Sequence, residues 1–80
     1  MRITVKLMAS LRSKLPAGAA GGKASIDVEP GTTIDSLQQH LGIASGQVHL
    51  VMVNGDMERD RSRVLAEGDE IVIFPPVAGG

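Results

Sequence analysis

The absence of cysteine from a chain of only 80 residues sets the tightest limit on how this protein can fold. Without cysteine there are no disulfides and no thiolate metal sites to hold a small fold together, and there is no thiol nucleophile. A chain of this length buries only somewhat more than about 60% of its unfolded surface. One compact core must therefore stabilise the protein, and we expect a single domain over residues 1–80.

Composition and charge narrow the class of protein further. The hydrophobic fraction is 42%, and Phe74 is the one aromatic residue. The formal net charge of −1 provides no basic surplus for nucleic acid or an anionic membrane. The N-terminal segment alternates polar and apolar residues, so neither a signal peptide nor a membrane span is expected. We expect a cytoplasmic protein that binds neither nucleic acid nor membrane.

Four strands are predicted. Residues 2–7 and 23–29 alternate apolar and polar side chains, the period of a half-buried strand, whereas residues 48–53 and 70–74 are more continuously apolar. Asn54-Gly55 is a strong signal for a tight turn after the third of these strands. Pro75 ends the last one, because proline cannot join a central ladder.

Two helices are predicted between the strands. Met8, Leu11 and Leu15 have the spacing of one helical face, and Pro16 ends that short helix. The second helix is capped by Thr32 or Thr33 and followed by Gly42, a typical C-terminal cap. Its apolar stripe is Ile34, Leu37 and Leu41.

This order of elements predicts an α+β fold. A mixed sheet of four to five strands with helices on one face is the economical packing for it. The charged segment from Met57 to Arg63 is expected to be a weak strand and a solvated surface. A second interpretation makes Arg59, Arg61 and Arg63 a rim that steers acidic partners.

The last strand is apolar on both faces. Ile71 and Ile73 can face the core, yet Val72 and Phe74 on the other side are also apolar. One interpretation is that β-branched residues simply suit central strands. The other is an exposed apolar sheet face that docks a partner, with Val72 and Phe74 as partner-binding residues.

The segment after Phe74 has the features of a slender tail, which we predict to be flexible, extended and protruding over residues 75–80. Pro75 and Pro76 favour a stiff, extended exit from the domain. Val77 and Ala78 are small, and Gly79 and Gly80 have no side chain. Such an end can enter a narrow active-site channel and present its carboxylate without steric cost.

Side chains within the chain offer no catalytic constellation. His40 and His49 fall on different predicted elements, and no cluster of carboxylates gives either histidine a set of metal ligands. The serines have no triad context. We therefore expect no metal site and no bound cofactor.

Four segments together resemble the MoaD/ThiS sulfur carriers, bacterial relatives of ubiquitin with the β-grasp fold. They are "ITVKLMASLR", "TTIDSLQQHL", "VMVNG" and "LAEGDEIVIFPPVAGG", which span nearly the whole chain. The last segment is most similar to the small subunit of molybdopterin synthase. The related carrier for thiamine is usually shorter and lacks the helix expected at residues 8–15.

The resemblance implies chemistry at Gly80 alone. An E1-like adenylyltransferase would use ATP to activate the Gly80 carboxylate, and sulfur would then replace AMP to give a thiocarboxylate. In molybdopterin synthase the tail, Pro75 to Gly79 included, would enter the large subunit of a heterotetramer and donate that sulfur. The chain would then be a sulfur-donating subunit without catalytic residues of its own.

Other functions are compatible with the same sequence. A carrier for thiamine or another sulfur-transfer pathway would share the tail, and a ubiquitin-like modifier would join Gly80 to lysines of other proteins. A plain interaction module would keep its function after loss of Gly79 and Gly80.

Overall fold

A computed structural model describes residues 1–76 of the chain, so that Val77, Ala78, Gly79 and Gly80 of the predicted tail lie outside the described residues. Strands, one α-helix and two short 3-10 helices alternate along this range. In order they are β1 (Arg2–Leu7), η1 (Ala9–Lys14), β2 (Lys23–Asp27), α1 (Ile34–His40), η2 (Ser45–Gln47), β3 (Leu50–Val53), β4 (Asp56–Met57) and β5 (Glu70–Phe74).

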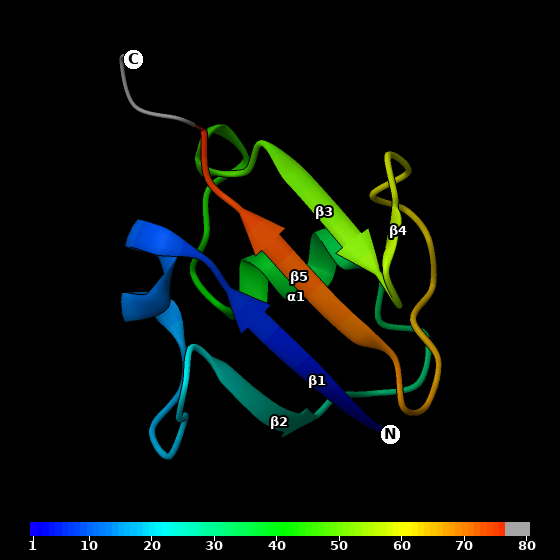
Figure 1. Cartoon of the computed structure of the whole chain (residues 1–80). Coiled ribbons are helices and arrows are strands. Elements are labelled where there is room, and N and C mark those ends of the chain that lie inside the picture. Colours follow the sequence, from blue (N-terminus) through cyan, green and yellow to red (C-terminus); the bar gives the residue numbers. More distant parts are fainter. Residues whose placement is uncertain (77–80) are drawn as a thin grey trace.

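The strands form one five-stranded sheet in the order β2-β1-β5-β3-β4. β1 and β5 pair in parallel at its centre, and the other neighbours are antiparallel. Helix α1 lies across one face of this sheet, behind it in Figure 1. The predicted α+β fold with a mixed sheet is confirmed, with β4 as the fifth strand.

The core lies between the sheet and α1. Alternate residues of the central strands point into it, as the period of the sequence predicted. Leu11 of η1 and Leu65, which precedes β5, complete it from outside the sheet. The buried apolar residues of the strands and of α1 are Ile3, Val5, Leu7, Val51, Val53, Ile71, Ile73, Ile34 and Leu37.

Helix α1 has the caps that the sequence predicts. Thr33 is the N-cap: its hydroxyl accepts from the Ser36 amide at 3.1 Å, and the Ser36 hydroxyl accepts from the Thr33 amide at 2.8 Å. At the other end Gly42 has φ 74°, and the amide of Ile43 donates to the Gln38 carbonyl. This Schellman motif turns Ile43 into the core.

The first predicted helix differs from expectation. Residues 9–14 form a 3-10 helix that begins at Ala9, whose φ is 49°. With about three residues per turn, its faces do not follow the spacing expected for an α-helix. Leu11 is buried and Leu15 packs on the core, but Met8 remains in extended backbone before the helix.

Two strand limits are also corrected. β2 ends at Asp27 rather than Glu29, and β3 begins at Leu50 rather than Val48. The unpredicted helix η2 causes the second difference, because the Val48 amide donates back to the Ser45 carbonyl at 3.2 Å.

The charged segment 58–63 is not the wholly solvated surface that was expected. The Arg61 carbonyl accepts from the Asp35 amide at 2.9 Å, and the Arg63 carbonyl accepts from the Ile34 amide at 3.2 Å. The Arg61 side chain donates to the buried Gln38 at 3.0 Å. The segment therefore satisfies amides in the first turn of α1 that have no partner within the helix.

A buried carboxylate joins the β3–β4 turn to the start of β5. Asp69, only 7% exposed, accepts from the Ala66 amide and from the Asn54 side chain, each at 2.8 Å. The Asn54 oxygen accepts in turn from the Glu70 amide at 2.9 Å. Burial by itself would raise the pKa of Asp69, but these hydrogen bonds and the charge of Arg63 hold it below the ordinary value.

We expect Asp69→Asn to destabilise the domain by about 1 to 3 kcal/mol at neutral pH, because an amide cannot accept both hydrogen bonds. The contribution of Asp69 depends on pH. Its carboxylate binds a proton less readily when folded than when unfolded, so its stabilising effect is complete above the unfolded pKa of about 3.9 and is lost as the pH falls through the folded pKa.

Urea unfolding between pH 7 and pH 2.5 measures this effect. The variant should lose less stability on acidification than the parent chain. Asp56→Asn, at an exposed carboxylate of β4, is the control and should match the parent. Equal pH dependence for Asp69→Asn and the parent would contradict the assignment.

Candidate functional site

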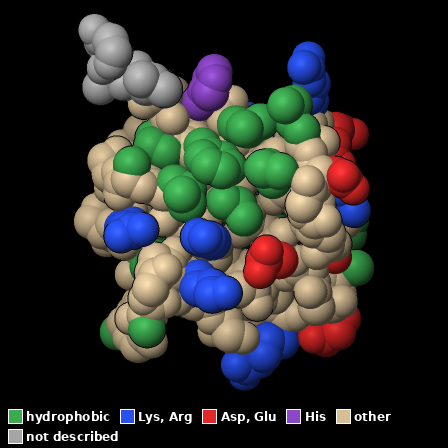
Figure 2. Space-filling view, viewed as in Figure 1, with side chains coloured by type: hydrophobic (Ala, Val, Ile, Leu, Met, Phe, Trp, Pro, Cys, Tyr) green, Lys and Arg blue, Asp and Glu red, His purple; other side chains and the backbone are tan. Residues whose placement is uncertain are grey.

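The face of the sheet opposite α1 carries a continuous apolar surface. We call it the apolar patch; it consists of Leu50, Met52, Met57, Val72 and Phe74. In the ladder Leu50 lies opposite Phe74, and Met52 lies opposite both Val72 and Met57. Figure 2 shows apolar side chains gathered over this part of the sheet. An apolar cluster left open on a sheet face is typical of a protein-binding surface.

The two predicted partner-binding residues belong to this patch. Val72 and Phe74 are half-buried, whereas Ile71 and Ile73 between them are 0% exposed. Both faces of β5 are therefore apolar: one face belongs to the core, and the other lies on the open side of the sheet. That a partner binds Val72 and Phe74 stays a prediction.

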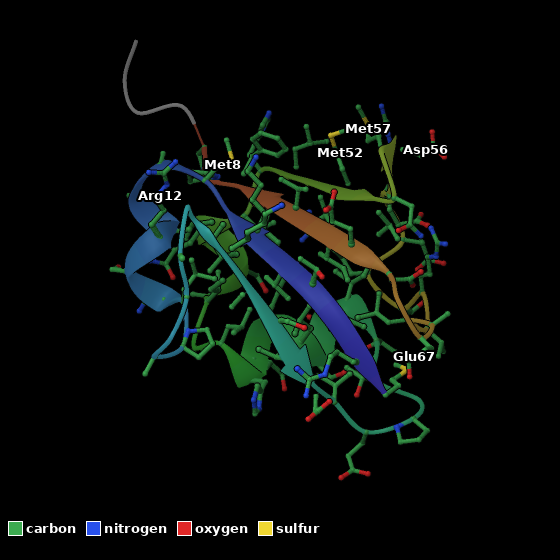
Figure 3. All side chains as sticks on the ribbon, turned by 60° about the horizontal axis from the view of Figure 1, so that its bottom comes forward. Met8, Arg12, Met52, Asp56, Met57 and Glu67 are labelled. Carbon is green, nitrogen blue, oxygen red and sulfur yellow. The ribbon has the colours of Figure 1, made fainter. Side chains whose placement is uncertain are left out.

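Methionines make up much of the open face. Met8, Met52 and Met57 lie on the same side of the sheet, away from α1, in Figure 3. Met57 is 54% exposed, a high value for a large apolar side chain. Methionine is flexible and polarisable, so it adapts to differently shaped partners. Met8 and Met57 are not among the site residues predicted from the sequence, although β-strand alternation continued beyond Leu7 places Met8 on the open face.

The described base of the tail begins beside the patch. Amides on both sides fix the end of β5: His49 donates to the Phe74 carbonyl at 2.8 Å, and Met8 donates to the Ile73 carbonyl at 3.1 Å. Pro75 is half-buried and Pro76 is exposed. The whole tail was predicted to protrude, but Pro75 lies partly against the domain.

A shallow groove runs along these prolines. Its volume is about 340 Å³. One wall belongs to η1 and the other to η2, so elements that precede β3 shape the point where the tail starts. The lining residues are Ser10, Leu11, Ser13, Lys14, Gly46, Gln47, Pro75 and Pro76.

One ion pair lies at the β4 border of the patch. Glu58 pairs with Arg63 at 2.9 Å, and Asp60 accepts from the Ser62 amide at 2.9 Å. Hydrogen bonds from the Asp60 amide and from Arg63 lower the pKa of Glu58. Of the predicted rim, Arg59 and Arg61 have no ion pair within residues 1–76, and Arg61 donates to Gln38 instead.

Side chains offer no reaction centre in the described part of the chain. Within residues 1–76, no group of three or more His, Cys, Asp or Glu side chains is placed to hold a metal ion. His40 ends α1 and His49 precedes β3, so the two are not brought together. No helix in the same range is long and apolar enough to cross a membrane. The candidate site within residues 1–76 is therefore the apolar patch and the adjoining base of the tail.

Comparison with known proteins agrees with this geometry. The family model "ThiS family" matches residues 5–80. No curated protein matches the chain. Among solved structures, SAMP1 from Haloferax volcanii is 28% identical with a TM-score of 0.68, over 100% of both chains.

Two further structures share the fold. The complex of subunits 1 and 2 of molybdopterin-converting factor from Helicobacter pylori 26695 matches at 20% identity and TM-score 0.62 over 100% of both chains. A putative molybdopterin converting factor, subunit 1, from Pyrococcus furiosus matches at 21% identity and TM-score 0.70, over 95% of this chain and 98% of that chain. The chain therefore belongs to the ThiS family, and it is a small sulfur carrier protein with the ubiquitin-like β-grasp fold.

Proposed function

We propose that the chain donates sulfur in molybdopterin biosynthesis as the small subunit of a molybdopterin synthase. The observation that carries the proposal is the continuity of β5. This strand contributes Val72 and Phe74 to the apolar patch and runs directly into Pro75 and Pro76. A partner docked on the patch would therefore lie where it can receive the tail.

The solved complex of molybdopterin-converting factor subunits from Helicobacter pylori supports this assignment. Its sequence identity of 20% carries the fold alone, so the pathway is our inference from the fold together with the "FPPVAGG" ending. The partner by this reasoning is a large synthase subunit that accepts the tail, with two copies of each subunit in the assembly.

The chemistry proposed for Gly80 proceeds in two steps on a second partner, an E1-like adenylyltransferase. A carboxylate oxygen of Gly80 attacks the α-phosphorus of ATP, which releases pyrophosphate and forms an acyl-adenylate. A thiol reduces a protein persulfide and is itself left in a disulfide; the hydrosulfide released then attacks the carbonyl carbon, and AMP leaves. The product is a thiocarboxylate, whose sulfur is transferred to the pterin precursor in the large subunit.

Gly79 and Gly80 suit a tail that enters an active site. They have no Cβ, so an active-site channel can close tightly around the backbone. In this proposal ATP belongs to the activating partner, and this chain needs no resident cofactor. The catalytic side chains also belong to the partners.

A second candidate function is protein modification. The similarity to SAMP1, a small archaeal modifier protein, favours it. The same activated Gly80 carboxylate would form an amide with a lysine of another protein. A carrier for thiamine-type sulfur transfer remains compatible with the ThiS family match.

Adding one residue after Gly80 should abolish activation, because the adenylated group would no longer end a Gly-Gly segment. Intact mass after incubation with the E1-like enzyme, ATP and a persulfide donor is the measurement. The parent chain should show one oxygen replaced by sulfur, and the extended chain should show no change while its circular dichroism spectrum remains that of the parent. Thiocarboxylate formation on the extended chain would contradict the mechanism.

Peptide mass spectrometry separates the two candidate functions. A sulfur carrier should yield the thiocarboxylate and no branched peptides. A modifier should yield lysine-containing peptides of other proteins that carry a Gly-Gly remnant from Gly79 and Gly80.

Phe74→Ala should weaken binding to the large subunit by about 2 kcal/mol, or about thirtyfold, if Phe74 anchors the interface. Its half-exposed side chain should matter less to folding. The matched variant is Ile73→Ala, one residue away and 0% exposed, which should cost about 2 to 5 kcal/mol of folding stability. Calorimetric titration and urea unfolding provide the two readouts; a collapse of the fold in Phe74→Ala would show that Phe74 is a core residue.

A further inference from the structure

Two lysines face each other directly across the β1–β2 ladder. Lys6 of β1 lies opposite Lys23 of β2. Both point to the open face, because the alternate residues of these strands, Val5 and Ile26 among them, pack into the core. Like charges directly opposite one another destabilise an antiparallel pair.

A third cation reaches the same place. The Arg12 side chain of η1 lies against Gly22, so closely that a Cβ at Gly22 would come within 3.1 Å of the Arg12 Nε atom. Gly22 immediately precedes Lys23, and Figure 3 shows Arg12 near the start of β2. We call Lys6, Arg12 and Lys23 the basic cluster.

Nothing in the described part of the chain compensates the basic cluster. Ion pairs in residues 1–76 join Arg2 to Asp27 and Arg63 to Glu58, and none involves the cluster. Glu70 lies on the neighbouring strand opposite Thr4, beyond ion-pair distance of Lys6. The three cations of the basic cluster therefore have no ion pair among residues 1–76 of the free domain.

The basic cluster adjoins the apolar patch and the base of the tail. Lys6 lies opposite Val72 in the β1–β5 ladder, and the Met8 amide holds the Ile73 carbonyl just before Phe74. Figure 2 shows Lys and Arg side chains along one border of the apolar patch. A protein seated on the patch would thus cover the cluster as well.

We propose that the basic cluster and the apolar patch form one recognition surface for a protein that presents carboxylates beside an apolar surface. This rests on the proposed function, since the protein in question is the E1-like adenylyltransferase that activates Gly80. Opposite charge across such an interface accelerates association and selects the partner. The repulsion between Lys6 and Lys23 is relieved when partner carboxylates lie between them.

The proposal makes stability and association change in opposite directions. Lys23→Glu turns the repulsive pair with Lys6 into an attractive one, so thermal unfolding should occur about 2 to 5 °C higher. The same variant should associate about fivefold to tenfold more slowly with the partner at low salt. Salt of about 1 M, where the Debye length is about 3 Å, should remove the difference.

The probe is the purified E1-like adenylyltransferase of the same organism, with association followed by fluorescence. Lys6→Glu should slow association as Lys23→Glu does, whereas Lys23→Arg should retain the parent rate. The double variant Gln39→Glu/His40→Glu lowers the net charge equally at exposed positions of α1, on the side of the sheet away from the patch, and is the matched control. Equal slowing by this control would show an effect of net charge alone and overturn the proposal.

A chain without Gly79 and Gly80 separates this inference from the proposed function. It cannot be activated at Gly80, yet it should associate with the same dependence on Lys6 and Lys23. Adenylation of the full chain with unchanged association of Lys6→Glu and Lys23→Glu would overturn the inference and leave the function standing. Association that depends on Lys6 and Lys23 without any adenylation of the full chain would support the inference and overturn the proposed function.

Failure of the parent chain to associate with the enzyme at any salt concentration would overturn the choice of partner. The choice of partner would also be overturned if the chain bound a duplex DNA oligonucleotide more tightly than it bound the enzyme, and if Lys6→Glu abolished that DNA binding.

Discussion

The parallel pairing of β1 with β5 organises the rest of the molecule. It joins the first and last strands at the centre of the sheet, with β3 on the far side of β5. Because β5 is central, its inner residues complete the core and its outer residues lie in the middle of the open face. The same pairing places Lys6 beside Val72 and the Met8 amide beside the Ile73 carbonyl. The core, the docking surface and the base of the tail therefore depend on one ladder.

The open face combines an adaptable part with a selective part. Met52 and Met57 can change conformation at little cost, so the apolar patch can fit surfaces of different shape. The charged side chains are more selective, because a partner carboxylate facing Lys6 and Lys23 attracts them, whereas a partner cation repels them. The proposed function, in which the chain binds an activating enzyme and an acceptor in turn, requires both properties.

Local signals in the sequence were sufficient for much of the fold. Gly42 and Asn54-Gly55 are found where a left-handed backbone is required, with φ 74° at Gly42 and 52° at Asn54. The alternation in β1 and β5 separated core from open face correctly. Long-range features were not readable: the positive φ of Ala9, the contact of Arg61 with α1 and the juxtaposition of Lys6 and Lys23 depend on chain segments that meet only in the folded state. The roles assigned to Gly79 and Gly80 stay predictions, since they concern chemistry on other proteins.

The central position of β5 also has a mechanical consequence. In the proposed function, a tail held in a partner's channel would transmit any pull along the axis of β5. The hydrogen bonds to β1 on one side and to β3 on the other run across that axis, so they are loaded together in shear and do not open one after another. Both ladders would therefore resist extraction of β5 from the sheet at once, and the domain would leave such a partner without unravelling from its C-terminal strand.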